Sequence, residues 1–239
     1  MTEVSTLSIL ALGFLLGLRH AVEADHVAAV STIVSESPSI LGSSFIGALW
    51  GIGHTLSLLI AGAAIVLFHF EISARMNLVL EFVVGLMLIA LGLNALRKLL
   101  HGGHLHMHVH QHGGRVHAHP HFHGGARETE IQGNHHGVKL QRRPIVIGMI
   151  HGLAGSGALM LLVLSTIRQP FVALLYVLIF GIGSTGGMMI MSVLIGLPAK
   201  LTAQRFARAN VILRGVAAGC TIALGMFITC EIGLGRLIG

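Results

Sequence analysis

The stretch Arg19-His20-Ala-Val-Glu23-Ala-Asp25-His26 places five ionisable side chains inside one of the long apolar blocks of the sequence. Charged groups at bilayer depth are costly, and they usually pair with one another or line an ion pathway. Two imidazoles and two carboxylates are also a suitable ligand set for a divalent transition metal. If the surrounding block crosses a membrane, this segment predicts a buried metal site.

Composition predicts a polytopic membrane protein. Of the 239 residues, 54% are hydrophobic and only 10% are charged, and the mean hydropathy is +0.83. Soluble domains carry about 25% charged residues. The apolar runs are continuous rather than alternating, which favours an all-α fold over a barrel. Six blocks reach the length of about 20 residues that a transmembrane helix needs: Ser5–Val34, Leu41–Phe68, Leu78–Leu100, Ile145–Ile167, Phe171–Leu197 and Val211–Ile238.

The basic residues predict the orientation in the cell membrane. They are dispersed over the loops, so the net charge of +6 does not indicate nucleic-acid binding. The loops after the first, third and fifth blocks carry 11 Lys and Arg residues, and the opposite side carries 3. Because cytoplasmic loops are enriched in Lys and Arg, we expect the long central loop in the cytoplasm and both termini outside.

Similar motifs recur about 130 residues apart. Gly17-Leu-Arg-His20 resembles Gly148-Met-Ile-His151, and Trp50-Gly-Ile-Gly-His54 resembles Phe180-Gly-Ile-Gly-Ser184. Small residues recur in all membrane helices, but the aligned histidines favour duplication. Because each half has three spans, the second half would enter from the opposite side, as in inverted-repeat transporters with a midplane site. We predict a three-helix membrane repeat in residues 1–100, a loop in 101–143 and a second repeat in 144–239.

Helical geometry restricts how one ion could be held. At 100° per residue, His26 lies about 240° around a helix from His20, and Asp25 about 140°. Either the first span is broken around Val22–Ala24, as transporter helices are at binding sites, or the residues serve different helix faces. We favour the break over the simpler reading of buried side chains satisfied by interhelical hydrogen bonds. The candidate metal residues are His20, Asp25, His26 and His54, with Glu23 and His151 as weaker candidates.

These motifs resemble those of a known family. Arg19-His20-Ala-x-x-Ala-Asp25-His26 is similar to the signature R-H-A-x-D-A-D-H of the nickel/cobalt transporter (NiCoT) family, with Glu23 in place of an Asp. Trp50-Gly-Ile-Gly-His54-Thr55 resembles the second motif of the family. His151-Gly-Leu-Ala-Gly-Ser-Gly-Ala158 resembles the fourth span of its short, six-span, urease-accessory-type members. The resemblance implies that His20, Asp25, His26 and His54 handle Ni²⁺ or Co²⁺.

Histidines dominate the central loop, where 12 of the 17 lie between His101 and His136. This segment is rich in Gly and poor in apolar residues, so we expect disorder. We interpret it as a cytoplasmic metal buffer or hand-off arm, with a plain solvated linker as the alternative. Its binding should weaken below about pH 6, because protons compete for imidazole. The accessory metal-binding candidates are His104, His106, His108, His110, His112, His117, His119, His121 and His123.

Uptake of Ni²⁺, with Co²⁺ as second substrate, is the function we expect. No nucleotide-binding motif is present, and we expect neither enzymatic activity nor a cofactor. The expected partners are the metal ion, membrane lipid and cytoplasmic nickel chaperones. The alternatives are Ni/Co efflux by proton antiport, a non-transporting membrane metallochaperone or sensor, and an intramembrane hydrolase using metal-bound water.

Overall fold

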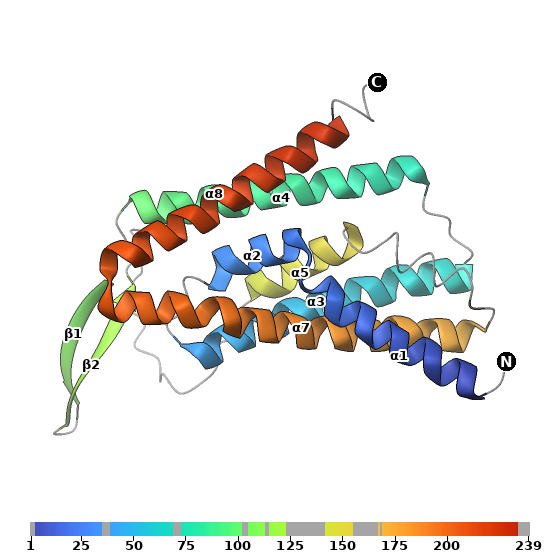
Figure 1. Cartoon of the computed structure of the whole chain (residues 1–239), viewed down its shortest axis with the longest axis horizontal. Coiled ribbons are helices and arrows are strands. Elements are labelled where there is room, and N and C mark those ends of the chain that lie inside the picture. Colours follow the sequence, from blue (N-terminus) through green and yellow to red (C-terminus); the bar gives the residue numbers. More distant parts are fainter. Residues whose placement is uncertain are drawn as a thin grey trace.

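The computed structural model describes residues 3–34, 39–68, 73–101, 105–112, 115–122, 142–154, 167 and 169–233. In these residues the chain forms seven helices and a two-stranded hairpin (Figure 1). The elements are α1 (Glu3–His20), α2 (Ala24–Val34), α3 (Ile40–Phe68), α4 (Ala74–Leu100), β1 (Leu105–His112), β2 (Arg115–Phe122), α5 (Arg142–Ala154), α7 (Pro170–Arg205) and α8 (Ala207–Ile232).

Four helices are long and apolar enough to cross a membrane: α3, α4, most of α7 and α8. α1 and α2 pass the same test together, as one span bent by 56°. The prediction of a helical chain is therefore confirmed, and four to five of the six predicted blocks contain helices long and apolar enough to span a membrane. The remaining block begins in α5 and continues into residues 155–166, outside the described part, so the sixth span stays a prediction.

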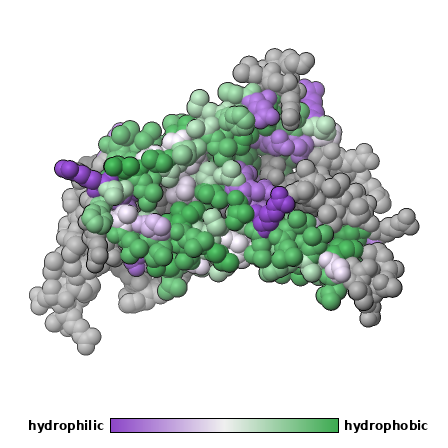
Figure 2. Space-filling view, viewed as in Figure 1, coloured by the Kyte–Doolittle hydropathy of each residue, from purple (hydrophilic) through white to green (hydrophobic). Residues whose placement is uncertain are grey.

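The face of the helices seen in Figure 2 is mostly apolar. On α3, Ile52, Leu56 and Ile60 are each about half exposed, whereas His54 and Ser57 are buried. Soluble monomers rarely expose such continuous apolar surface. An apolar exterior around polar side chains is the arrangement expected of helices surrounded by lipid.

The first span is broken where the sequence predicts it. α1 ends at His20, and the backbone N–H groups of Val22 and Glu23 donate to the carbonyls of Arg19 and His20, each at 3.1 Å. The chain then restarts as α2 at Ala24. The predicted break around Val22–Ala24 is thus confirmed. Because of the bend, residues on opposite sides of the break can approach one another.

Equivalent contacts recur in the two halves. α1 packs along α7, and α5 packs along α3. A Cβ on Gly17 of α1 would overlap the carbonyl oxygen of Phe180, and a Cβ on Gly148 of α5 would overlap that of Trp50. Gly148 follows Gly17 by 131 positions, and Phe180 follows Trp50 by 130. Glycine permits the same close approach of two backbones in both halves.

The two halves meet directly between α3 and α7. Thr55 donates its hydroxyl to the carbonyl of Gly181 at 3.1 Å, and its oxygen lies 3.2 Å from that of Thr185. Thr55 and Thr185 are equivalent positions, 130 residues apart. This pairing of matched residues puts the junction of the halves at the centre of the α3–α7 contact.

α2 is enclosed by the other helices. Ala29 and Val30 are buried in one core with Trp50, Leu88 and Met188, from α3, α4 and α7. Thr221 of α8 also donates its hydroxyl to the carbonyl of Ala28 at 3.0 Å. These contacts fix α2, and with it the first-turn residues Asp25 and His26, inside the bundle.

The central loop contains an antiparallel hairpin where the sequence predicts disorder. β1 and β2 pair so that His106 is opposite His121, His108 opposite His119 and His110 opposite His117. Alternation of His with residues such as Leu105, Met107 and Val109 has the period of two that suits a strand. Alternate strand residues lie on the same face, so these three pairs share one face of the ribbon. His104 and His123 lie outside the described residues.

Candidate metal centre

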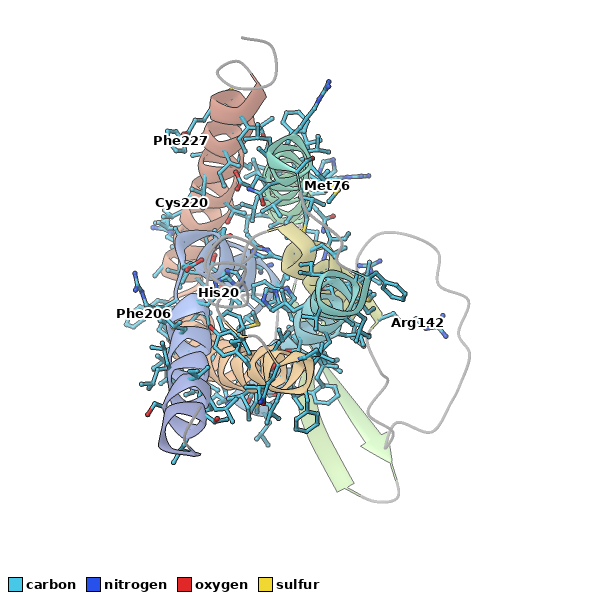
Figure 3. All side chains as sticks on the ribbon, turned by 90° about the vertical axis from the view of Figure 1, so that its right-hand side faces the viewer. His20, Met76, Arg142, Phe206, Cys220 and Phe227 are labelled. Atoms are coloured by element: carbon cyan, nitrogen blue, oxygen red, sulfur yellow. The ribbon has the colours of Figure 1, made fainter. Side chains whose placement is uncertain are left out.

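Four histidines from four helices meet in the interior and form the histidine cluster: His20, His26, His54 and His151. They belong to α1, α2, α3 and α5, and none is more than 3% exposed. The ring centre of His26 lies 4.1 Å from that of His151 and 4.3 Å from that of His20. His54 completes the cluster, with ring centres 5.2 Å from His20 and 5.3 Å from His26. Figure 3 shows His20 in the middle of the bundle, between the helices.

Carboxylates hold three of these rings. Asp25 accepts the backbone N–H of His26 at 2.8 Å, and the same oxygen lies 3.0 Å from Nδ1 of the His26 ring. Its other oxygen lies 3.0 Å from Nε2 of His151. Glu23 contacts Nδ1 of His20 at 2.9 Å. A carboxylate on one ring nitrogen orients the other nitrogen toward a metal and raises its basicity.

The opposite ring nitrogens have no partner among the described residues. These atoms are Nε2 of His20, Nε2 of His26, Nδ1 of His151 and both ring nitrogens of His54. Burying a polar group without a hydrogen bond is costly, and here five such atoms lie within one cluster. A bound cation could take one nitrogen of each ring as a ligand, since imidazole nitrogen is a common ligand of Ni²⁺, Zn²⁺ and Cu²⁺.

The cluster contains two overlapping groups of potential ligands. His20, His26 and His54 form one group, and Asp25, His26 and His151 form the other. Within each group, one ligand atom per residue lies within 4.8 Å of the others. Sequence reasoning placed His20, Asp25, His26 and His54 in one site. The structure brings all four together with His151 but separates Asp25 from His20 and His54, with His26 common to both groups.

Two aromatic side chains that were not predicted to belong to the site form its walls. The Trp50 ring lies 5.4 Å from that of His26 and 5.6 Å from that of His151. The Phe180 ring lies 5.5 Å from that of His20. A signal was present in the sequence, because Trp50 and Phe180 occupy equivalent positions in the repeated motif.

Comparison with known proteins identifies the family. The chain is 40% identical over 217 residues to the urease accessory protein UreH of Bacillus sp. (strain TB-90). The match covers 90% of this chain and 87% of that relative. The chain belongs to the UreH family of urease accessory proteins. No protein-family model and no solved structure matches it.

The loop histidines occupy a different part of this UreH-family chain. His106, His108, His110 and His112 lie on β1, and His117, His119 and His121 lie on β2. Figure 1 places both strands at one end of the helical bundle, whereas α2 and α5 lie in its middle. The hairpin and the histidine cluster are therefore separate candidate sites for metal.

Proposed function

We propose that this chain transports Ni²⁺, with Co²⁺ as a second substrate, across the cell membrane into the cytoplasm. The observation that carries the proposal is the histidine cluster, whose buried ring nitrogens lack partners among the described residues. Such groups are rare inside membrane helices unless they serve an ion pathway. The cluster would hold the ion during its passage.

Two further observations support nickel as the cargo. Membership of the UreH family of urease accessory proteins points to a role in nickel handling or transport. The motifs at Arg19–His26 and Trp50–Thr55 resemble those of nickel/cobalt transporters, and we assign the chain to that wider family. Affinity for nitrogen ligands rises from Co²⁺ to Ni²⁺, which makes Co²⁺ the weaker of the two substrates.

We further propose six spans arranged as two inverted repeats. α1 and α7 run parallel, because Gly13 contacts Tyr176 and Gly17 contacts Phe180 further along both helices. α3 and α7 run antiparallel, since Gly47 contacts Met188 and Gly62 contacts Val177. These directions agree with α1 and α7 as the first and fifth spans and α3 as the second. The cluster would then lie between the halves, where inverted-repeat transporters bind substrate.

The shared ring of His26 supports a transfer between two positions. An ion bound by His20, His26 and His54 could pass to Asp25, His26 and His151 while remaining attached to His26. The first group belongs entirely to the first half of the chain, and the second group includes His151 of the second half. Movement of the halves relative to each other would favour one group or the other.

Membrane potential supplies enough free energy for uptake. A divalent cation that moves inward gains about 4.6 kcal/mol per 100 mV, twice the value for one charge. At 1.4 kcal/mol per decade, this supports roughly thousandfold accumulation without a coupling ion. The positive charges around the central loop suggest that it is cytoplasmic. There its histidines would buffer the ion and pass it to cytoplasmic nickel chaperones.

The test is ⁶³Ni²⁺ flux into proteoliposomes under an imposed potential, with and without a proton gradient. We expect influx driven by an inside-negative potential alone, and competition by excess Co²⁺. Proton-dependent extrusion would reverse the proposed direction. If the purified protein binds nickel but shows no flux in either direction, the function is that of a metallochaperone or sensor and not of a transporter. Liposomes that carry the His26→Ala variant are the control for leakage.

A further inference from the structure

Every fourth residue along one side of α7 is buried, and we call this set of five residues the hydroxyl row. It consists of Tyr176, Phe180, Ser184, Met188 and Ser192, of which none is more than 2% exposed. Three members carry hydroxyl groups: Tyr176, Ser184 and Ser192. None of these hydroxyls has a hydrogen-bond partner among the residues that the structure describes.

Several other hydroxyls on the helices are satisfied by the preceding turn of their own helix. Ser57 donates to the carbonyl of His54 at 2.8 Å, and Thr229 donates to that of Gly225 at 2.7 Å. Thr221 donates to the carbonyl of Ala217 in the same way. A return bond to the preceding turn is the ordinary solution for Ser and Thr in helices. Ser184 and Ser192 do not use it, and a buried hydroxyl without a partner destabilises the fold.

The hydroxyl row passes the histidine cluster. Its second member, Phe180, contacts the ring of His20, and Gly17, one turn before His20, lies against the backbone of Ser184, the third member. Rows of every fourth residue wind slowly around a helix. Accordingly, Tyr176 lies against Gly13 of α1, whereas Ser192 lies against Gly47 of α3.

The row also covers most of the thickness of a membrane. The 16 residue steps from Tyr176 to Ser192 span about 24 Å along a helix, and the hydrocarbon core is about 30 Å thick. We propose that Tyr176, Ser184 and Ser192 line the path by which a hydrated divalent cation reaches and leaves the histidine cluster. This inference rests on the transport function proposed above and extends it from the site to the route.

Hydroxyl oxygens suit such a path. They are neutral acceptors that can replace or contact the water molecules around a cation, and they bind it weakly enough for the ion to move on. Tyr176 would serve the outer half of the path and Ser192 the cytoplasmic half, given the proposed orientation. In this structure Tyr176 packs against Gly13 and Ser192 against Gly47, so these contacts would have to open when the ion passes.

The first test removes the hydroxyls without changing the packing. For Tyr176→Phe and Ser192→Ala we expect ⁶³Ni²⁺ uptake to fall about threefold to tenfold, the range set by one neutral hydrogen bond. Nickel affinity of the detergent-purified protein should stay unchanged, because neither residue belongs to the histidine cluster. Thr229→Val is the matched control, since that hydroxyl is satisfied within α8, and its uptake should equal that of the wild type.

The second test measures access by water. In a background with Cys220→Ala and Cys230→Ala, single cysteines replace Tyr176, Ser184 or Ser192 and are treated with a charged, membrane-impermeant methanethiosulfonate. We expect Tyr176→Cys to react from outside and Ser192→Cys from the cytoplasmic side, with protection by Ni²⁺. Ile182→Cys is the control, because Ile182 is 51% exposed on the lipid side of α7 and should not react.

The two proposals fail in different ways. Nickel flux with normal rates in the hydroxyl variants and no labelling of any row cysteine would overturn the path and leave transport intact. Labelling of the row cysteines, together with an absence of nickel flux through the wild-type protein, would overturn nickel transport while keeping a water-accessible path. If the hydroxyl variants lose uptake and nickel affinity to the same extent, the row supports the structure of the histidine cluster. That result would also overturn the proposed path.

Discussion

His26 is common to both groups of candidate metal ligands. His26→Ala removes one ligand from each group, whereas His54→Ala and His151→Ala each affect only one. We therefore expect His26→Ala to abolish ⁶³Ni²⁺ uptake and to cause the largest loss of nickel affinity in calorimetry on the purified protein. His54→Ala and His151→Ala should retain weaker binding. His101→Ala is the control, because that exposed side chain at the end of α4 lies outside the cluster.

Equal losses in all three cluster variants would contradict two overlapping groups and indicate one site with four equivalent imidazoles. Wild-type uptake in His26→Ala would remove the histidine cluster from the transport path altogether. In both cases the His101→Ala protein establishes that replacing a histidine does not by itself impair expression or folding.

Reasoning from single residues of the sequence predicted which residues lie in the cluster, but not that they form two overlapping groups. His20, Asp25, His26 and His54 stand out because ionisable groups are rare in apolar blocks, and His151 was found through the repeat. The assignment of Asp25 to His151 rather than to His20 depends on how α5 packs against α3, which local patterns do not encode. Trp50 and Phe180 were missed as walls for the same reason: an aromatic residue in a membrane helix is ordinary until its neighbours are known.

Among the elements, the break between α1 and α2 was predictable and the hairpin was not. Angular spacing on a helix is a local property, so His20 and His26 could be recognised as incompatible with one straight span. Strand pairing in residues 105–122 depends on register between distant positions, and a Gly-rich, His-rich composition is typical of disorder. The alternation of His with Leu105, Met107 and Val109 suits a strand, but short alternating runs carry less weight than the composition of the whole segment.

Close packing of α1 on α7 depends on Gly17. A methyl group on this residue would overlap the backbone carbonyl of Phe180, which cannot move aside as a flexible side chain would. We expect Gly17→Ala to lower the free energy of unfolding by about 1–3 kcal/mol, the usual cost of overpacking, and to displace His20. Thermal unfolding in detergent measures this, with Gly219→Ala as control, because a Cβ there meets no other atom within 4 Å. Equal melting temperatures of the two variants would contradict the close α1–α7 contact.

The hairpin element should tune uptake without being essential to it. Deletion of residues 102–136 leaves the histidine cluster complete, so we expect the maximal rate of ⁶³Ni²⁺ uptake to be retained. Apparent affinity or regulation should change, most clearly near neutral pH, where imidazoles are unprotonated and can bind metal. Below about pH 6 the deletion variant and the wild type should converge, because protons occupy the loop imidazoles. Loss of all uptake on deletion would make the loop part of the transport path.

At the scale of the whole molecule, the repeat explains why one site is built from both halves. The contacts of Gly17 with α7 and of Gly148 with α3 are equivalent, yet His54 in the first half corresponds to Ser184 in the second. The matched helix contacts thus recur in both halves, while the candidate metal ligands are concentrated in the first half. Opposite orientations of the halves would let a symmetric scaffold open to either side of the membrane around an asymmetric site.

Orientation of the whole chain decides which side of the membrane the His-rich hairpin faces, and two exposed positions report it. Arg75 at the start of α4 should lie outside, and Phe206, 65% exposed between α7 and α8, should lie in the cytoplasm. With Cys220 and Cys230 replaced by Ala, we expect an impermeant thiol reagent to label Arg75→Cys in intact cells and Phe206→Cys only after permeabilisation. The reverse pattern would place the His-rich hairpin outside. Because α7 ends at the Phe206 turn, it would also exchange the outer and cytoplasmic ends of the Tyr176–Ser192 row.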